Sequence, residues 1–386
     1  MLLVKVISPK YFLLLFGSLL AIDFVSFYYN QNLEIFSSYY VFDYSYYLLT
    51  IIYFFLAFLA SYLGLTVGEK INPGFRKTQQ KPLTNLFVYV YALVIVVYFL
   101  FLFLLFSQGL SKQIFFRSFP LLSIIGMSIF YFYAYYLFLS KSSLKRKIII
   151  TIFIMTSLII SDSRGTVIFV VIAFALFYDL KVKKISTLKI LAMSFSFIAF
   201  LLFSRFYLRE SYRFDNLSEF IASQGSVFST FFETVEFSQA EALYVLINFS
   251  DFFRGWYESI LAGLMYLIPR SIAEFKPLGA SSFFTEISYP DKWYISKSEI
   301  VVSGFGDAFL SFGWLGIIFL FFIFIPVGLL YKHYVRNNYY HLILILLYLE
   351  YSFLRGDLYN LAGKIWILLL FLVVKYMFDI ISRRRV

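Results

Sequence analysis

Cysteine is absent from the 386-residue sequence, which excludes disulfide bonds, thiolate metal sites and cysteine nucleophiles. Charged residues make up only 14%, whereas a soluble domain has about a quarter. The sequence also lacks an Asp-x-Asp pattern, a His-Glu-x-x-His pattern and a phosphate-loop lysine motif. The metal–diphosphate clamp of nucleotide-sugar transferases is therefore missing, and no metal or other cofactor is expected.

Hydrophobic residues are abundant instead. They form 61% of the chain and recur in long runs over nearly its whole length, so the sequence predicts a polytopic membrane protein. The net charge of +11 would suit a nucleic-acid binder, but the lysines lie in short loops between apolar runs, as the positive-inside rule requires. We therefore expect contact with membrane lipid and no nucleic-acid partner.

The apolar runs predict an all-α fold of about ten transmembrane helices. In this arrangement 20 of the 33 basic residues fall in loops on one side, which we assign to the cytoplasm together with both termini. No small-residue cleavage site follows the first run, so we expect that helix to be retained. The predicted spans cover residues 11–29, 46–67, 86–106, 120–140, 148–161, 166–178, 188–205, 307–331, 339–354 and 358–378.

These spans divide the chain into three parts. Residues 1–205 form an N-terminal bundle of seven spans, residues 206–306 a large outer loop, and residues 307–386 a C-terminal bundle of three spans. The loop is too long to be a passive connector. Its apolar stretch 256–268 is too short to span and predicts an interfacial or re-entrant helix.

The fifth, sixth and ninth spans are short for membrane-crossing helices. The fifth and sixth have 14 and 13 residues, which gives each a length of about 20 Å, against a hydrocarbon core of about 30 Å. The turn between them, residues 161–166, and the turn after the ninth span are therefore expected below the outer surface. Non-helical backbone at that depth must face protein or a water-filled cavity.

Arginine followed by glycine recurs on the predicted outer side. The pairs are Arg164-Gly165, Arg254-Gly255 and Arg355-Gly356. A guanidinium binds phosphate through two parallel hydrogen bonds and stays charged, and a recessed arginine is costly in a membrane. We predict that Arg164 and Arg355, helped by Arg254 or Arg270, bind an anionic lipid headgroup. The alternative for the first and third is an ion pair with the acid two residues away.

Carboxylates in or beside the outer loop supply candidates for a general base, which a sugar-hydroxyl nucleophile would need. Asp307 is the best placed, because it opens the eighth predicted span. Glu258 and Glu274 are the other candidates. An equally good explanation of Asp307 is that an acid at a helix N-terminus is favoured by the helix dipole.

At this point the chain resembles the O-antigen (Wzy-type) polysaccharide polymerases, also called oligosaccharide repeat-unit polymerases. The resemblance covers the topology over nearly the full length and the large outer loop. Two local segments carry it further: Ser-Asp-Ser-Arg-Gly at 161–165 and Gly-Asp-Ala-Phe-Leu-Ser-Phe-Gly-Trp-Leu-Gly at 306–316.

The resemblance implies a metal-independent glycosyltransferase with a GT-C-like fold in the bacterial inner (cytoplasmic) membrane. Such an enzyme would polymerise undecaprenyl-diphosphate-linked repeat units, as donor and acceptor, into O-antigen or capsular polysaccharide at the outer face. Arg164 and Arg355, with Arg254 or Arg270, would clamp the diphosphate, and Asp307, with Glu258 or Glu274 behind it, would take the acceptor proton. A chain-length regulator protein is a further partner that the family suggests.

Three other functions are alternatives to the polymerase. An O-antigen-type ligase would use the same donor, but the resemblance leads us to expect a histidine in its outer loop, and this loop has none. A lipid-linked oligosaccharide flippase would have more spans and shorter loops. An O-acyltransferase would need a catalytic histidine, but His333 and His341 lie near the predicted cytoplasmic ends of spans.

Overall fold

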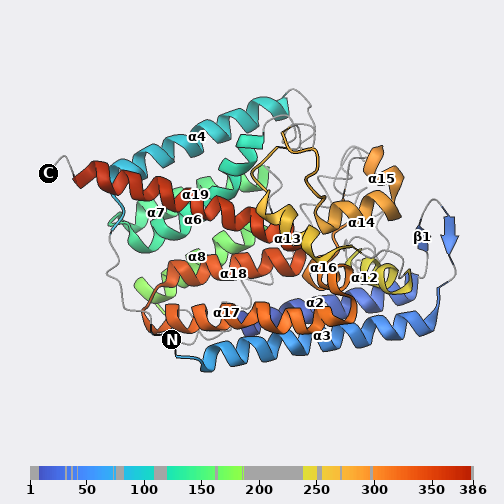
Figure 1. The fold of residues 1–386 in the computed structure, drawn as a ribbon. Coiled ribbons are helices and arrows are strands. Elements are labelled where there is room, and N and C mark those ends of the chain that lie inside the picture. Colours follow the sequence, from blue (N-terminus) through green and yellow to red (C-terminus); the bar gives the residue numbers. More distant parts are fainter. Residues whose placement is uncertain are drawn as a thin grey trace, which may run out of the picture.

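The structure is a computed structural model, and its helices form an elongated bundle with both termini at one end (Figure 1). The structure describes residues 8–30, 33–35, 38–40, 42–72, 74, 82–107, 120–160, 164–184, 186, 238–249, 254–269, 272–295 and 299–383. The long helices are α2 (Pro9–Asn30), α3 (Tyr44–Lys70), α4 (Asn85–Ser107), α6 (Pro120–Leu139), α7 (Leu144–Ile160), α8 (Arg164–Lys181), α17 (Gly316–Arg336), α18 (Tyr340–Arg355) and α19 (Leu358–Arg383).

Shorter elements gather at the end of the bundle away from the termini (Figure 1). They are α12 (Ser238–Asn248), α13 (Trp256–Leu264), α14 (Ala280–Ser288), α15 (Pro290–Tyr294), α16 (Ser303–Phe312) and the 3₁₀ turn η2 (Gly313–Leu315). A small antiparallel hairpin of β1 (Leu33–Ile35) and β2 (Ser38–Tyr40) also lies there, with Leu33 opposite Tyr40. The prediction of an all-helical fold is therefore confirmed for the described residues except at this hairpin.

Within the described ranges, three helical segments are long and apolar enough to cross a membrane: Pro9–Tyr28, Tyr44–Lys70 and Ser303–Arg336. This supports the coarse prediction of a membrane protein. Each predicted span within the described residues is helical, and the seventh, 188–205, lies outside them. The eighth differs from its prediction: it begins earlier and is broken between α16 and α17, where Gly313 adopts a φ of 57°.

The helices of the fifth and sixth spans are also longer than predicted. α7 has 17 residues and α8 has 18, which corresponds to about 26 Å each at 1.5 Å per residue. The extra turns contain charged residues at the end of the bundle that holds the termini, such as Lys145 and Lys181, whose long side chains can reach a polar interface. The ninth span is short as predicted, because α18 has 16 residues.

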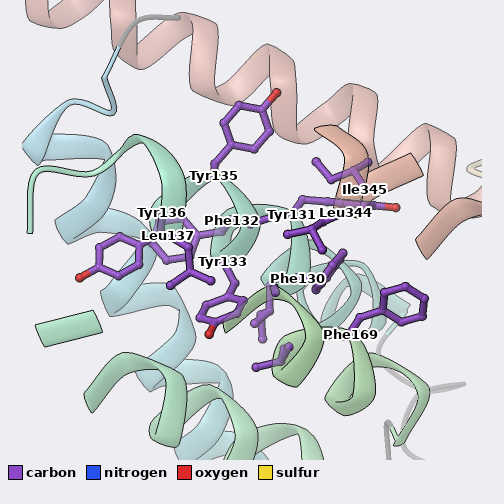
Figure 2. Packing of buried hydrophobic residues seen from close by; sticks show 14 of the residues in the cluster. Phe130, Tyr131, Phe132, Tyr133, Tyr135, Tyr136, Leu137, Phe169, Leu344 and Ile345 are labelled. Carbon is purple, nitrogen blue, oxygen red and sulfur yellow. The ribbon is translucent and has the colours of Figure 1, made fainter. Parts of the chain in front are cut away.

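The core has two connected clusters of buried apolar side chains, with α18 contributing to both. In the first cluster, α6 is buried without a break from Ile129 to Leu137. Figure 2 shows its rings packed with Phe169 of α8 and with Leu344 and Ile345 of α18. A helix that is apolar all round and buried all round belongs at the centre of a bundle.

Close backbone packing joins α3 to α17. A side chain at Gly64 would collide with the carbonyl of Phe321, and one at Gly68 with the carbonyl of Ile325. The spacing of two glycines four residues apart is the small-residue pattern by which helices approach closely in membranes. This closely packed pair of helices forms one edge of the bundle (Figure 1).

The two ends of the bundle differ in charge and content. α3 ends at Lys70, α8 at Lys181 and α19 at Arg383, all at the end that holds the termini (Figure 1). Lys332 of α17 donates to the carbonyl of Lys70 at 3.4 Å, which joins α17 to α3 at this end. The outer-loop helices lie at the opposite end, which is the distribution expected if the basic end faces the cytoplasm.

Candidate functional site

The turn between α18 and α19 is the centre of the candidate site. α18 ends at Arg355, and α19 begins at Leu358. Figure 1 shows this turn well short of the end of α3, with α12, α14 and α15 beyond it. Arg355 is exposed and donates from Nη1 to the Tyr351 hydroxyl at 2.8 Å, while its carbonyl accepts from Gln239 of α12 at 3.1 Å. The sequence predicted that this arginine lies below the outer membrane surface, and this depth stays a prediction.

The Arg164-Gly165 pair and the Arg355-Gly356 pair meet at Tyr351. Arg164 is the first residue of α8, and Gly165 follows it in the first turn. A Cβ placed on Gly165 would lie 2.7 Å from the Tyr351 hydroxyl oxygen, so this ring would have to shift if any other residue replaced the glycine. Thr166 continues the contact through a 3.1 Å hydrogen bond with Tyr348. Two hairpins nearly two hundred residues apart therefore converge on one face of α18.

Arg254, from the Arg254-Gly255 pair, is buried rather than presented to solvent. Its side chain is 1% exposed and donates to the carbonyl of Leu278 and, over 3.4 Å, to Glu258. Its backbone N–H donates to the carbonyl of Leu310 at 3.2 Å. Nη1 has no hydrogen-bond partner in the described part of the chain. Arg254 thus fastens the start of α13 to α16 and to the loop before α14.

Asp307 is also buried, and both of its carboxylate oxygens accept hydrogen bonds. Oδ1 accepts from Ser259 at 2.8 Å and from Ser311 at 3.1 Å, and Oδ2 accepts from the backbone N–H of Leu358 at 2.8 Å. The carboxylate therefore joins α13, α16 and the N-terminus of α19. The general-base role stays a prediction, and it would require one of these bonds to open.

The other predicted residues fall in different places. Glu258 lies on α13 with a side chain 33% exposed, beside Arg254. Glu274 is exposed on the segment between α13 and α14. Arg270 lies outside the described residues. Of the carboxylates expected to act as base, Glu258 is the one that combines exposure with an adjacent guanidinium.

Buried aspartates elsewhere hold helix N-termini, a role that the sequence reasoning did not find. Asp357 accepts from the backbone of Ser281 at 2.9 Å, at the start of α14, and from the backbone of Asn360 at 2.8 Å, at the start of its own helix. Asp23 accepts from the backbone of Ala240 at 2.7 Å in the first turn of α12. Carboxylates are favoured at these positions because helix N-termini carry unpaired N–H groups and partial positive charge.

The helix predicted at 256–268 is present in a shorter form, and its interfacial or re-entrant position stays a prediction. α13 ends at Leu264, and its small residues Ala262 and Gly263 are buried against α19. Its opposite side exposes Trp256 and Leu264 by 57% and 62%. An amphipathic helix with exposed aromatic and aliphatic residues is typical of one lying at a membrane interface.

A cluster of polar contacts around Lys364 was also missed by the sequence reasoning. Lys364 of α19 donates to Ser352 at 2.6 Å and lies 4.4 Å from the centre of the Tyr348 ring. Tyr131 of α6 donates to the carbonyl of Lys364 at 2.8 Å. Burial, with Tyr359 and Tyr348 nearby, raises the pKa of the Tyr266 hydroxyl to about 12, so it stays a donor at neutral pH.

No group of three or more His, Cys, Asp or Glu residues that could hold a metal ion occurs in the described ranges. Comparisons with protein-family models, with curated proteins and with solved structures find no match. The function must therefore be argued from the chemistry of the site.

Proposed function

We propose that this protein is an inner-membrane glycosyltransferase that polymerises oligosaccharide repeat units carried on undecaprenyl diphosphate. The observation that carries the proposal is the meeting of two Arg-Gly hairpins at Tyr351, at a turn recessed within the bundle. Guanidinium groups in a recessed place suit an anion that arrives with a lipid tail, because the tail can lie between helices while the charge reaches the arginines. A GT-C-like fold of about ten spans is part of the proposal.

The reaction transfers a glycan between two lipid carriers. The acceptor hydroxyl oxygen attacks the anomeric carbon of the donor, the bond from that carbon to the diphosphate oxygen breaks, and the diphosphate leaves with the electron pair. Arg164 and Arg355 would stabilise the negative charge that develops on the leaving group. Fixed cations at the position of developing charge are effective in a site shielded from water.

A carboxylate must receive the proton of the acceptor hydroxyl. We assign this part to Glu258, because it is partly exposed beside Arg254, with Glu274 as the second candidate. Asp307 would then have a positioning role, because its hydrogen bonds hold α13 against α16 and α19. Arg254 would support Glu258, and Arg270 would join the diphosphate site from the same loop.

The test is polymer length in a deletion strain complemented with variants. Arg164→Ala and Arg355→Ala should each shorten or abolish the polymer, and the Lys replacements should rescue little, because lysine lacks the planar fork of arginine. Arg336→Ala is the matched control: like Arg355, Arg336 is an exposed arginine that ends a helix, but it ends α17 at the opposite end of the bundle. If both outer variants express normally and make full-length polymer, the clamp is wrong.

Orientation needs its own measurement. Reporter fusions should place the α18–α19 turn outside and the α17–α18 turn in the cytoplasm. The opposite result would remove the proposed site from the side where the lipid-linked glycan is polymerised.

The ligase alternative shares the donor and differs in the acceptor. His333 lies in the last turn of α17 and His341 in the first turn of α18, at the end opposite Arg355. This placement fits the polymerase better, because a ligase is expected to use an outer histidine. Single repeat units on the final acceptor in a deletion strain would favour the polymerase, and lipid-linked units kept on the inner leaflet would favour the flippase.

A further inference from the structure

Lys364 stands out because it is a cation within the bundle with no acid beside it. It lies on α19 two turns from Asp357, and it forms no ion pair in the described part of the chain. Ser352 is the one hydrogen-bond acceptor that its ammonium reaches among the described residues. An ammonium carries three N–H donors, so two are left for another group.

The surroundings of Lys364 are rich in hydroxyl donors. Tyr348, whose ring lies 4.4 Å from the ammonium, places its hydroxyl 3.1 Å from Thr166. Tyr266 packs its ring against Gly363, the residue before the lysine. Hydroxyl groups and an ammonium together offer hydrogen bonds and charge to an oxyanion.

Lys364 also belongs to the same region as the recessed arginine. The charged and titratable groups that act on it electrostatically are Tyr351 and Arg355. Tyr351 accepts the 2.8 Å hydrogen bond from Arg355, and Ser352, the next residue, accepts from Lys364 at 2.6 Å. Two cations therefore flank one turn of α18, Arg355 at its exposed end and Lys364 deeper in the bundle. Because Lys364 and Arg355 both carry a positive charge, they repel each other, and an anion between them would offset that repulsion.

We propose that Lys364 and Arg355 are the inner and outer contacts of one diphosphate site, with Tyr348 and Tyr351 along its wall. The inference rests on the proposed function for the identity of the lipid, while the anion site itself rests on these contacts. The half-buried ammonium binds the inner phosphoryl group, and Arg355 binds the one nearer the outside. The lipid tail of a polyprenyl diphosphate then lies among the apolar helices.

Binding is measured on the purified full-length protein in lipid nanodiscs by calorimetric titration with farnesyl diphosphate. Lys364→Met should weaken binding at least about tenfold, since it removes a charge-assisted contact. Lys364→Arg should stay within about threefold of the unaltered protein, because it keeps the charge. Should the methionine variant fail to fold, Lys364→Gln, which can still donate to Ser352, should show the same loss.

Lys375→Met is the matched control, because Lys375 lies on the same helix and is already paired with Asp379 at 2.8 Å. It should bind farnesyl diphosphate as the unaltered protein does. Two results would overturn the proposal and leave Lys364 with only a structural role. In the first, Lys364→Met and Lys375→Met lose binding equally; in the second, Lys364→Met melts at a lower temperature but binds normally.

A second titration with inorganic pyrophosphate separates lipid-borne from free diphosphate. Weaker binding of pyrophosphate than of farnesyl diphosphate supports the lipid carrier, and equal binding overturns that assignment. Neither titration requires sugar transfer. Lys364-dependent binding in a protein that makes no polymer would therefore support the anion site while refuting the polymerase.

Discussion

Asp307 offers the sharpest separation of a structural carboxylate from a catalytic one. Replacing it with asparagine keeps the shape, and the three hydrogen bonds can be rebuilt. The amide oxygen would accept from the backbone N–H of Leu358, and the amide N–H groups would donate to Ser259 and Ser311, whose hydroxyls can rotate to accept. We expect Asp307→Asn to fold, to melt close to the unaltered protein and to make polymer.

Asp307→Ala should behave differently, because its hydrogen-bond donors lose their acceptor. Ser259 and Ser311 lie 2.9 Å apart and can still bond each other, so one hydroxyl hydrogen and the backbone N–H of Leu358 are left unsatisfied. At about 1–3 kcal/mol for each buried unsatisfied donor, the loss is about 2–6 kcal/mol. This should lower the melting midpoint by several degrees.

The assay is intrinsic fluorescence during heating of the detergent-solubilised protein, paired with polymer length in cells. Unfolding of a membrane protein is often irreversible, so all variants are compared at one scan rate. Glu258→Gln is the companion variant and should fold normally but make no polymer. An Asp307→Asn protein that melts normally yet makes no polymer would refute our reasoning and return the base role to Asp307.

Three further predictions concern packing and capping. Gly165→Ala places a methyl 2.7 Å from the Tyr351 hydroxyl oxygen and displaces that ring, so it should lower stability and shorten the polymer. The double variant Gly165→Ala/Tyr351→Ala should recover the stability but not the polymer. Asp23→Ala removes the cap of α12 and should cost about 1–2 kcal/mol, read as a lower melting midpoint; an unchanged midpoint would contradict the capping role. Glu350 is buried with neither oxygen hydrogen-bonded in the described residues, so Glu350→Leu should raise the midpoint; a fall would show that the carboxyl has a stabilising contact.

The candidate site was only partly visible in the sequence. The Arg-Gly pairs and the short ninth span predicted a recessed Arg355, because apolar length fixes where a helix stops. The same pattern could not show that Arg254 is buried, since that depends on α16 and Leu278 closing over it. The sequence did not single out Lys364, because this residue lies inside a predicted span and its neighbours on α18 cannot be read from the local pattern.

Asp307 shows the limit in another way. Its place near a predicted helix start suggested a favourable interaction with the dipole of its own helix. In the structure α16 begins at Ser303, and the N-terminus that Asp307 serves is that of α19, some fifty residues later. The sequence suggested the right interaction, a carboxylate at a helix N-terminus, but assigned it to the wrong helix. Which N-terminus Asp307 reaches depends on how α16 crosses the α18–α19 turn.

Hydrophobic run length and the distribution of lysines were enough to determine the helical class, most helix positions and the common end of both termini. These are properties of each segment and its solvent, so local sequence carries them. Which side chains lie together around Tyr351, and which carboxylates hold helix N-termini, was decided only by tertiary packing. Those relations join residues from separate helices, and the sequence does not contain the crossing geometry that brings Gly165, Tyr351 and Lys364 together.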